Sequence, residues 1–420
     1  MKPTLQKTIL TATLSAIVGL SNVANAQWVQ VNNALTDQEV NALMVSGNNL
    51  FAGTGTISSN SSGNNGVFLT TDNGDNWVEK NSGLISINPP FNLGVSCFAV
   101  SGNNIFAGTD GENSGGLFLS ADNGNTWTAA NSGIPNGTDV YSLAIAGSTI
   151  FAGCDDDKVY ISNNNGSTWA AGSSVTGSGG KIRALAVSGT NIFAGAGNRG
   201  VFLSTDNGQT WTAVNTGLGA SIPYENIYAL AVSGTNIFAG AYGGGVFISA
   251  NNGAQWNAVN NGLTSKLVKA FAISGNVIFA GTEYYGTFVS TDNGSNWAGT
   301  GSAGQSVVAL AYNSTYLFAG TKGDGVFRRP LSEIAAGINN TINNSNFSIY
   351  PNPSNNHLFI EISNFKNTTA EIYNITGQLM EKIILQNERT TINTEKFSSG
   401  IYFLKIKNAE NVSVKKFAKE

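Results

Sequence analysis

Apolar and polar positions alternate in short runs along most of the chain. A phrase of the form ALxVSGxxxFAGT occurs seven times between Ala42 and Thr321. In each copy two short apolar runs flank a turn rich in Gly and Asn, which is the pattern of two antiparallel strands joined tightly. A second phrase, GVFLSTDNGxxWTAVN in its fullest form, has six copies and predicts two more strands around a second turn. The pattern therefore predicts a repeated unit of four antiparallel strands.

The period of the repeat indicates the fold class. Every copy of the first phrase has a phenylalanine before its Ala-Gly pair, and successive phenylalanines are 39 to 55 residues apart. They are Phe51, Phe106, Phe151, Phe193, Phe238, Phe279 and Phe318. Such a period with four short strands per unit is typical of β-propeller blades. The last unit stops at Pro330 and has no WTAVN segment of its own. The segment Trp28–Asn32 near the N-terminus matches WTAVN and can supply the seventh copy. We therefore expect an all-β protein in which residues 27–330 form a seven-bladed propeller closed by its N-terminal strand.

Composition and charge exclude several classes of function. Only 11% of residues are charged, 51 of 420 are glycine, and the net charge of −4 comes without any block of Lys and Arg. Nucleic acid is therefore excluded as a partner. The only histidine, His357, lies outside the propeller, which excludes Ser-His and Cys-His catalysis there. The consecutive carboxylates of Asp155–Asp157 lie on one short loop and cannot all converge on a calcium ion without partners. We expect no metal and no cofactor.

The N-terminus has the three-part pattern of a secretory signal peptide over residues 1–26. Lys2 and Lys7 precede an apolar run over residues 8–20, and Ala24-Asn25-Ala26 precedes Gln27. That run is shorter than the roughly 20 residues that span a bilayer, so we expect cleavage and no membrane-spanning segment in the mature chain. Only Cys97 and Cys154 are present. They fall in different repeats, which favours two buried thiols over a disulfide.

The second phrase resembles the Asp box, or BNR repeat, of sialidases, sortilin-like receptors, photosystem assembly factors and xyloglucan-cleaving glycoside hydrolases. These propellers have unrelated functions, so the resemblance implies the architecture and no activity. The position of the acid is occupied by Asp72, Asp122, Asn164, Asp206, Asn251 and Asp292. Asn keeps the hydrogen-bond acceptor and loses the charge. We therefore interpret the box as a structural turn and not as a catalytic or metal-binding site.

Loops on one face of the propeller are uniform, and those on the other vary. On the variable face, Tyr141, Arg183, Tyr228 and Lys269 precede the innermost strands of neighbouring blades, with Tyr242, Tyr284 and Tyr285 close by. Aromatic rings beside cations suit a sugar or an anionic or peptidic ligand; the other interpretation is that the tyrosines cap the blades and the cations are solvated. We predict a secreted or cell-surface protein that binds a glycan, peptide or protein. The alternatives are a glycoside hydrolase with a carboxylate pair on this face and a structural or adhesive surface protein.

The C-terminal residues do not follow the sequence pattern of the repeats. After an Asn-rich linker over residues 331–345, residues 346–420 contain alternating strands that suit a small immunoglobulin-like β-sandwich. Their motifs are Tyr350-Pro351-Asn352-Pro353, the segment 371–380 with Gly377, the segment 397–406 with Gly400, and Lys415 with Lys416. In this order they resemble the type A C-terminal sorting domain of the type IX secretion system of Bacteroidetes. The resemblance implies export, the secretion machinery as a partner, and attachment to the surface or release. We expect a monomer.

Overall fold

The computed structural model describes residues 27–420, apart from 56–64, 85–92, 112–114, 198, 220–225, 276, 305, 339–346, 363–364, 366–367, 375–377 and 408–411. The predicted signal peptide and Gly377 lie outside the described residues. The described chain consists almost entirely of β-strands, with one helix among its elements. The all-β prediction is confirmed.

Between residues 29 and 330 the described residues form seven four-stranded antiparallel sheets. The first sheet consists of β2(Val40–Ser46), β3(Asn49–Thr54), β4(Gly66–Thr70) and β5(Val78–Glu79). The second consists of β6(Gly94–Ser101), β7(Asn104–Asp110), β8(Gly116–Ser120) and β9(Thr128–Ala129). The third consists of β10(Val140–Ala146), β11(Thr149–Cys154), β12(Lys158–Ser162) and β13(Ala170–Ser174). The fourth sheet consists of β14(Ile182–Ser188), β15(Asn191–Ala196), β16(Gly200–Ser204) and β17(Thr212–Ala213). The fifth consists of β18(Ile227–Ser233), β19(Asn236–Ala241), β20(Gly245–Ser249) and β21(Asn257–Ala258). The sixth consists of β22(Val268–Ser274), β23(Val277–Thr282), β24(Gly286–Ser290) and β25(Ala298–Gly299). The last sheet has the order β1(Val29–Gln30), β28(Val326–Pro330), β27(Tyr316–Thr321) and β26(Val307–Tyr312).

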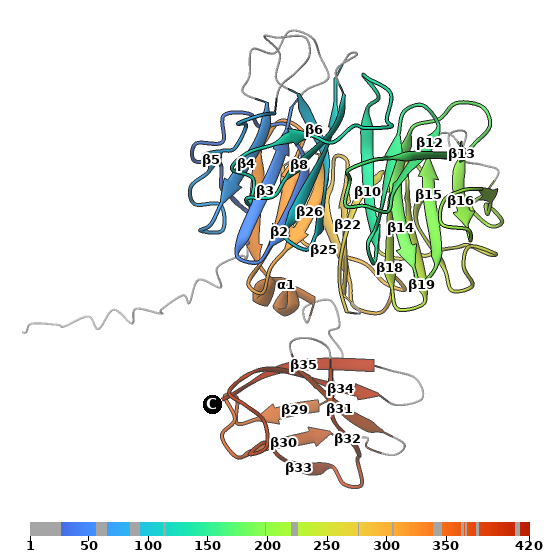
Figure 1. Cartoon of the computed structure of the whole chain (residues 1–420). Coiled ribbons are helices and arrows are strands. Elements are labelled where there is room, and N and C mark those ends of the chain that lie inside the picture. Colours follow the sequence, from blue (N-terminus) through green and yellow to red (C-terminus); the bar gives the residue numbers. More distant parts are fainter. Residues whose placement is uncertain are drawn as a thin grey trace, which may run out of the picture.

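The sheets stand around a common axis as in a β-propeller (Figure 1). Their first strands contact one another in the cyclic order β2, β6, β10, β14, β18, β22 and β26, and β26 contacts β2. The FAGT glycine permits this approach: a Cβ at Gly53 would lie 2.6 Å from Cγ1 of Val95 in the next sheet, and one at Gly320 would lie 2.7 Å from Cγ1 of Val40. The preceding phenylalanines are at most 3% exposed and fill the space between sheets. The repeated phrase thus encodes the packing of one sheet on the next.

The N-terminal strand completes the last sheet. β1 pairs antiparallel with β28, and Val29 lies opposite Arg328. Asn32 Oδ1 accepts a hydrogen bond from the Val326 amide at 2.7 Å, the same bond that Asn81 Oδ1 makes with the Val67 amide. Asn131, Asn215 and Asn260 make it in three further sheets. The prediction that the N-terminal strand completes the last sheet is therefore confirmed.

The Asp or Asn side chain at the acid position of the second phrase stabilises the second turn of each repeat by accepting hydrogen bonds. Ser204 Oγ donates to Asp206 Oδ1 at 2.7 Å, and the Thr210 amide donates to the same oxygen at 2.9 Å. Asn164 Oδ1 accepts the corresponding bonds from Ser162 Oγ and the Thr168 amide, both at 2.9 Å. The same donors surround Asp72, Asp122, Asn251 and Asp292. An amide replaces the carboxylate without changing the turn, which supports the structural interpretation.

The segment predicted as a linker begins with a helix. Leu331–Ile338 form α1, directly after β28. Ile334 is 4% exposed and belongs to the hydrophobic cluster of Trp28 and Leu310, with Leu331 packed against it. These two apolar residues stand three positions apart on one face of the helix. The Asn-rich composition after residue 338 obscured this short pattern.

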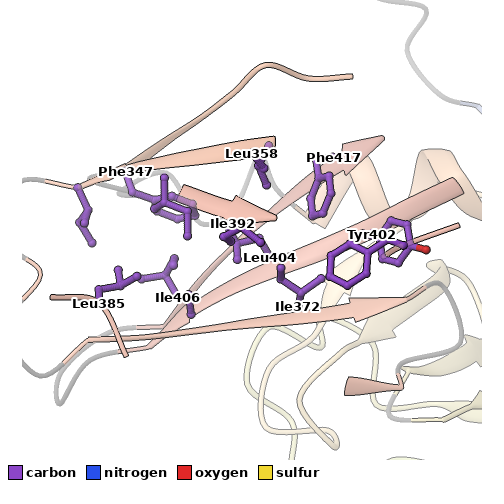
Figure 2. Packing of buried hydrophobic residues seen from close by; sticks show 13 residues of the cluster. Phe347, Leu358, Ile372, Leu385, Ile392, Tyr402, Leu404, Ile406 and Phe417 are labelled. Carbon is purple, nitrogen blue, oxygen red and sulfur yellow. The ribbon is translucent and has the colours of Figure 1, made fainter. Parts of the chain in front are cut away.

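The C-terminal residues form two sheets around a separate core. The strands are β29(Phe347–Tyr350), β30(His357–Ile362), β31(Thr369–Asn374), β32(Leu379–Ile384), β33(Arg389–Asn393), β34(Gly400–Lys407) and β35(Val412–Lys419). The sheet orders are β29-β30-β33 and β32-β31-β34-β35. Side chains from both sheets meet between them (Figure 2), among them Leu358 and Ile392 opposite Leu404 and Ile406.

The predicted sorting motifs tie the ends of this unit together. Asn352 Oδ1 accepts a hydrogen bond from the Ala418 amide at 2.9 Å, and its amide nitrogen donates to the Lys416 carbonyl at 3.2 Å. Lys415 Nζ donates to the carbonyl of Phe347. The peptide bonds before Pro351 and Pro353 are cis. The motif residues therefore join the first strand of the unit to its last.

Candidate functional site

Four chemically distinctive side chains stand at the same place in neighbouring sheets. Tyr141, Arg183, Tyr228 and Lys269 are the second residues of β10, β14, β18 and β22. In each strand the pairing register shifts at this residue, because it has no partner on the next strand. A β-bulge re-aims the side chain that it carries. The residue before it, such as Val140 or Ile182, is fully buried, so the bulged side chain is left to the variable face.

These side chains form one continuous row, called here the cation–aromatic row. Arg183 Cζ lies 4.8 Å from the ring centre of Tyr228 and 5.7 Å from that of Tyr141. Lys269 Nζ lies 3.6 Å from the Tyr228 ring and 4.6 Å from the Tyr242 ring. The two rings of Tyr228 and Tyr242 are 5.8 Å apart. The structure thus brings together five of the seven residues that the sequence singled out, with cations and rings in alternation.

The two cations of this row differ in their partners. Lys269 Nζ lies 3.3 Å from Glu283 Oε2, and the Glu283 charge raises the pKa of Tyr242. Arg183 makes no ion pair or hydrogen bond with any described residue, and its Nε is buried. A buried guanidinium donor without an acceptor is rare in folded proteins. Arg183 therefore has donors left for a ligand.

At the other end of the row, acids surround Tyr141. Lys181 Nζ donates to the Tyr141 hydroxyl at 2.6 Å, and that hydroxyl donates to Asp139 Oδ2 at 3.1 Å. Asp155 Oδ1 accepts a hydrogen bond from the Asp139 amide at 3.2 Å. Asp110 is 4% exposed, and burial, reinforced by the Asp139 charge, raises its pKa to about 6. Sequence reasoning missed Lys181 because it belongs to an irregular segment that has no counterpart in the other repeats.

A cavity of about 290 Å³ opens beside this end of the row. Its lining residues are Asp155, Gly179, Gly180, Lys181, Arg183, Gly197 and Asn226. Tyr284 and Tyr285 remain 62% and 61% exposed in the loop between β23 and β24, and Tyr284 has a φ of 75°. They flank the row without entering it. Glu112 and Glu225, two further acids in the variable loops that a glycoside hydrolase could use, lie outside the described residues.

The three side chains of the acidic run Asp155–Asp157 bind different partners and do not converge. Asp156 Oδ2 accepts the Tyr160 hydroxyl at 2.7 Å, and Asp157 Oδ1 accepts the Thr176 amide at 3.0 Å. Across the part of the chain that the structure describes, no group of three His, Cys, Asp or Glu residues could hold a metal ion. Cys97 and Cys154 are free thiols, and burial raises the pKa of both. Their roles are packing roles, since thiolates are the reactive form.

Comparison with known families assigns the C-terminal unit. Residues 348–420 match the model of the secretion system C-terminal sorting domain. The C-terminal unit is a sorting domain. A sorting domain of the type IX secretion system indicates secretion or attachment to the outer-membrane surface. Residues 87–239 match the DUF6242 beta propeller domain, which agrees with the observed ring. Within the described residues, no helix is long and apolar enough to cross a membrane.

Solved structures share the fold at low sequence identity. PorZ, described as an essential surface component of the type IX secretion system of Porphyromonas gingivalis, is 18% identical with a TM-score of 0.54; the match covers 91% of this chain and 60% of PorZ. YCF48 from Cyanidioschyzon merolae is 17% identical, with a TM-score of 0.54 and coverage of 73% and 99%. The GH74 xyloglucanase of Xanthomonas campestris is 16% identical, with a TM-score of 0.55 and coverage of 73% and 54%. No curated protein matches the chain in sequence. These similarities establish the propeller fold and leave the ligand open.

Proposed function

We propose that this protein is an extracellular binding protein that recognises a glycan, peptide or protein through the variable face of its propeller. The observation that carries the proposal is the cation–aromatic row, in which Arg183 lies between the rings of Tyr141 and Tyr228 without an acidic partner among the described residues. Aromatic faces and a cation with unused donors suit a polar, ring-containing or anionic ligand. The route of secretion brings this face to the outside of the cell.

Packing alone does not account for the row. A tyrosine that only caps a blade needs a partner for its hydroxyl and cover for its ring. Tyr141 has both, through Asp139 and Lys181. The cation of Arg183, however, adds no hydrogen bond that holds the sheets together, and Tyr284 and Tyr285 leave more than half of their area exposed. Varied loops on a rigid scaffold are where proteins usually place binding.

A glycoside hydrolase on the same face is the alternative. Such an enzyme needs two carboxyl groups about 5–10 Å apart that both reach the glycosidic bond. Asp110 and Asp139 are neighbours, and Asp110 has the raised pKa of a general acid. Asp110 is, however, only 4% exposed, and an acid must contact the leaving oxygen. Its burial favours binding over hydrolysis.

The proposal is tested by screening the purified chain, with both domains, on arrays of glycans and of peptides. The double variant Tyr141→Ala/Tyr228→Ala removes the two rings around Arg183, and we expect it to lose binding at least tenfold. The control is Tyr316→Ala, which removes a comparable ring beside Arg328, 5.0 Å away in the last sheet, and which we expect to bind normally. Equal binding by the double variant and the control would refute the assignment of the face. Product analysis of each hit separates binding from cleavage.

A further inference from the structure

The junction between the sheet of β10–β13 and the sheet of β14–β17 is built differently from the others. Around the ring, indole nitrogens donate to a carbonyl of the preceding sheet or strand, as Trp256 Nε1 does to Val214 O at 2.7 Å. The same bond is made by Trp28, Trp77, Trp127, Trp169 and Trp297. Trp211 Nε1 is buried and has no partner. The regular contact between sheets is therefore lost at one junction among the described residues.

The cause is the course of β13. It spans Ala170–Ser174, whereas the outer strands of the other sheets have two residues, and its register with β12 shifts between Lys158 and Tyr160. Asp157, at a φ of 64° and 3% exposed, then holds the next segment through the amides of Thr176 and Gly179, at 3.0 and 3.3 Å. This arrangement brings Gly179, Gly180 and Lys181 to the cavity. Departures from a regular pattern that weaken packing concentrate at functional sites.

The lining of this cavity has one chemical character. Among the described residues, its lining consists of glycines, two cations, Asp155 and Asn226, with no apolar side chain among them. Pockets for apolar ligands or peptide side chains are lined mainly by hydrophobic groups. Glycine backbone, an amide and a carboxylate suit the hydroxyl groups of a sugar, and the volume of about 290 Å³ is at the small end for ligand sites. The cavity therefore fits one sugar unit better than a segment of peptide.

The charge of that sugar follows from Arg183. Its guanidinium faces the rings of Tyr141 and Tyr228 while its Nε stays buried without a partner. Rings against the faces of a guanidinium leave its edge, with its N–H groups, for planar recognition of a carboxylate. We infer that the cavity is a subsite for an acidic sugar, a uronic or sialic acid residue whose carboxylate is bound by Arg183. This inference rests on the proposed function and specifies its ligand.

Each part of the subsite has a distinct task. Arg183 binds the carboxylate, and Lys181, which already donates to the Tyr141 hydroxyl at 2.6 Å, adds positive charge beside it. The adjacent Tyr228 ring lies against the sugar that follows the acidic one. Asp155, which lines the same cavity, accepts a hydrogen bond from a hydroxyl group of the sugar. Removing Arg183 should therefore abolish the preference for acidic sugars and leave weaker contacts with neutral ones.

The test is an array of oligosaccharides containing glucuronic, galacturonic, mannuronic or sialic acid, each beside its carboxyl-reduced form, with acidic peptides on the same slide. We expect the purified chain to bind at least one acidic glycan about tenfold or more better than its reduced form. Arg183→Gln should remove this difference, and Arg183→Lys should retain part of it because the charge remains. The control Lys322→Gln changes a lysine whose side chain is 64% exposed and whose ion pair with Glu39 spans 3.9 Å, and it should bind normally. Thermal unfolding establishes that each variant is folded.

The possible failures are distinguishable. Equal binding of acidic and reduced forms, or a preference that survives Arg183→Gln, overturns the acidic-sugar inference while the binding function stands. Binding of acidic peptides alone, lost in Arg183→Gln, also overturns it and makes the partner a protein. Binding of neither glycans nor peptides contradicts both the inference and the proposed function.

Discussion

The closure of the propeller by its N-terminal strand leads to a quantitative prediction for Asn32→Ala. Asn32 Oδ1 accepts from the amide of Val326, a fully buried residue, at 2.7 Å, and Asn32 Nδ2 donates to Asp324 O at 2.9 Å. Leaving a buried N–H without an acceptor costs about 1–3 kcal/mol, and the second hydrogen bond contributes about 1 kcal/mol. We therefore expect Asn32→Ala to lower the free energy of pairing between β1 and β28 by about 2–4 kcal/mol.

A matched control exists within the same chain. Asn81 Oδ1 accepts from the Val67 amide at 2.7 Å, but its strand is joined to β4 by a turn. Asn81→Ala should thus lower stability by a similar amount without releasing the N-terminal strand. The assay is hydrogen exchange of the amides in residues 326–330, read by mass spectrometry. Because 2 kcal/mol is roughly a 30-fold change in an equilibrium, Asn32→Ala should accelerate exchange there roughly 30-fold or more.

Asn81→Ala should leave that segment protected. Exchange at residues 326–330 that is equally slow in both variants would show that Asn32 does not hold the closure. Equal acceleration in both variants would show that the ring opens only by global unfolding. Either result would refute the reasoning that the last sheet has its own local stability.

Three further predictions follow from buried and bonded side chains. Asp206→Ala should lower stability at pH 7 by about 1 kcal/mol per lost hydrogen bond, and Asp206→Asn, which keeps an acceptor but loses the charge, should lower it less. The bonds from Thr210 and Ser204 lower the pKa of Asp206 to about 2, so the stability that its charge contributes is present above about pH 4 and lost as the pH falls through 2. The difference in stability between the native chain and the Asn variant should therefore disappear below pH 2 in acid unfolding. Trp211→Phe should destabilise less than Trp256→Phe in urea unfolding, since only Trp256 Nε1 has a hydrogen bond to lose; equal losses would contradict the unpaired state of Trp211. Burial raises the pKa of Asp110 to about 6, so the folded state retains a proton that the unfolded state releases near pH 4, and this stabilising contribution declines as the pH rises from 4 to 6. Asp110→Asn should therefore raise the thermal unfolding temperature at pH 8 and not at pH 4, and an equal effect at both values would refute the shift.

The fold followed from the sequence because its packing is local and repeated. The FAGT glycine, the buried phenylalanine and the asparagine after the tryptophan strand each make one contact that recurs, so a pattern of seven copies predicts seven similar sheets. The match of Trp28–Asn32 with the WTAVN strand predicted that the N-terminal strand completes the last sheet. The sorting domain was likewise recognised from the order of its motifs.

The site was predicted only in part because it depends on departures from the repeat. The positions of Tyr141, Arg183, Tyr228 and Lys269 could be aligned between copies, and their proximity followed from the ring. Lys181 and the glycine loop could not be aligned, because their placement depends on the course of β13 and on the carboxylate of Asp157. The helix α1 escaped notice because it depends on Ile334 meeting a cluster formed by distant residues.

The pairing of β1 with β28 also has a consequence in time. The strand at residues 29–30 is synthesised first, yet its partner at residues 326–330 appears only after almost the whole ring has been made. Until then the sheet formed by β26 and β27 is incomplete, and the bond from Trp28 to the Thr300 carbonyl can form only once the sheet of β22–β25 has been made. Each earlier sheet, by contrast, is complete as soon as its own four strands exist. The protein can therefore acquire sheets one by one during synthesis or translocation, but it becomes a ring in a single late step.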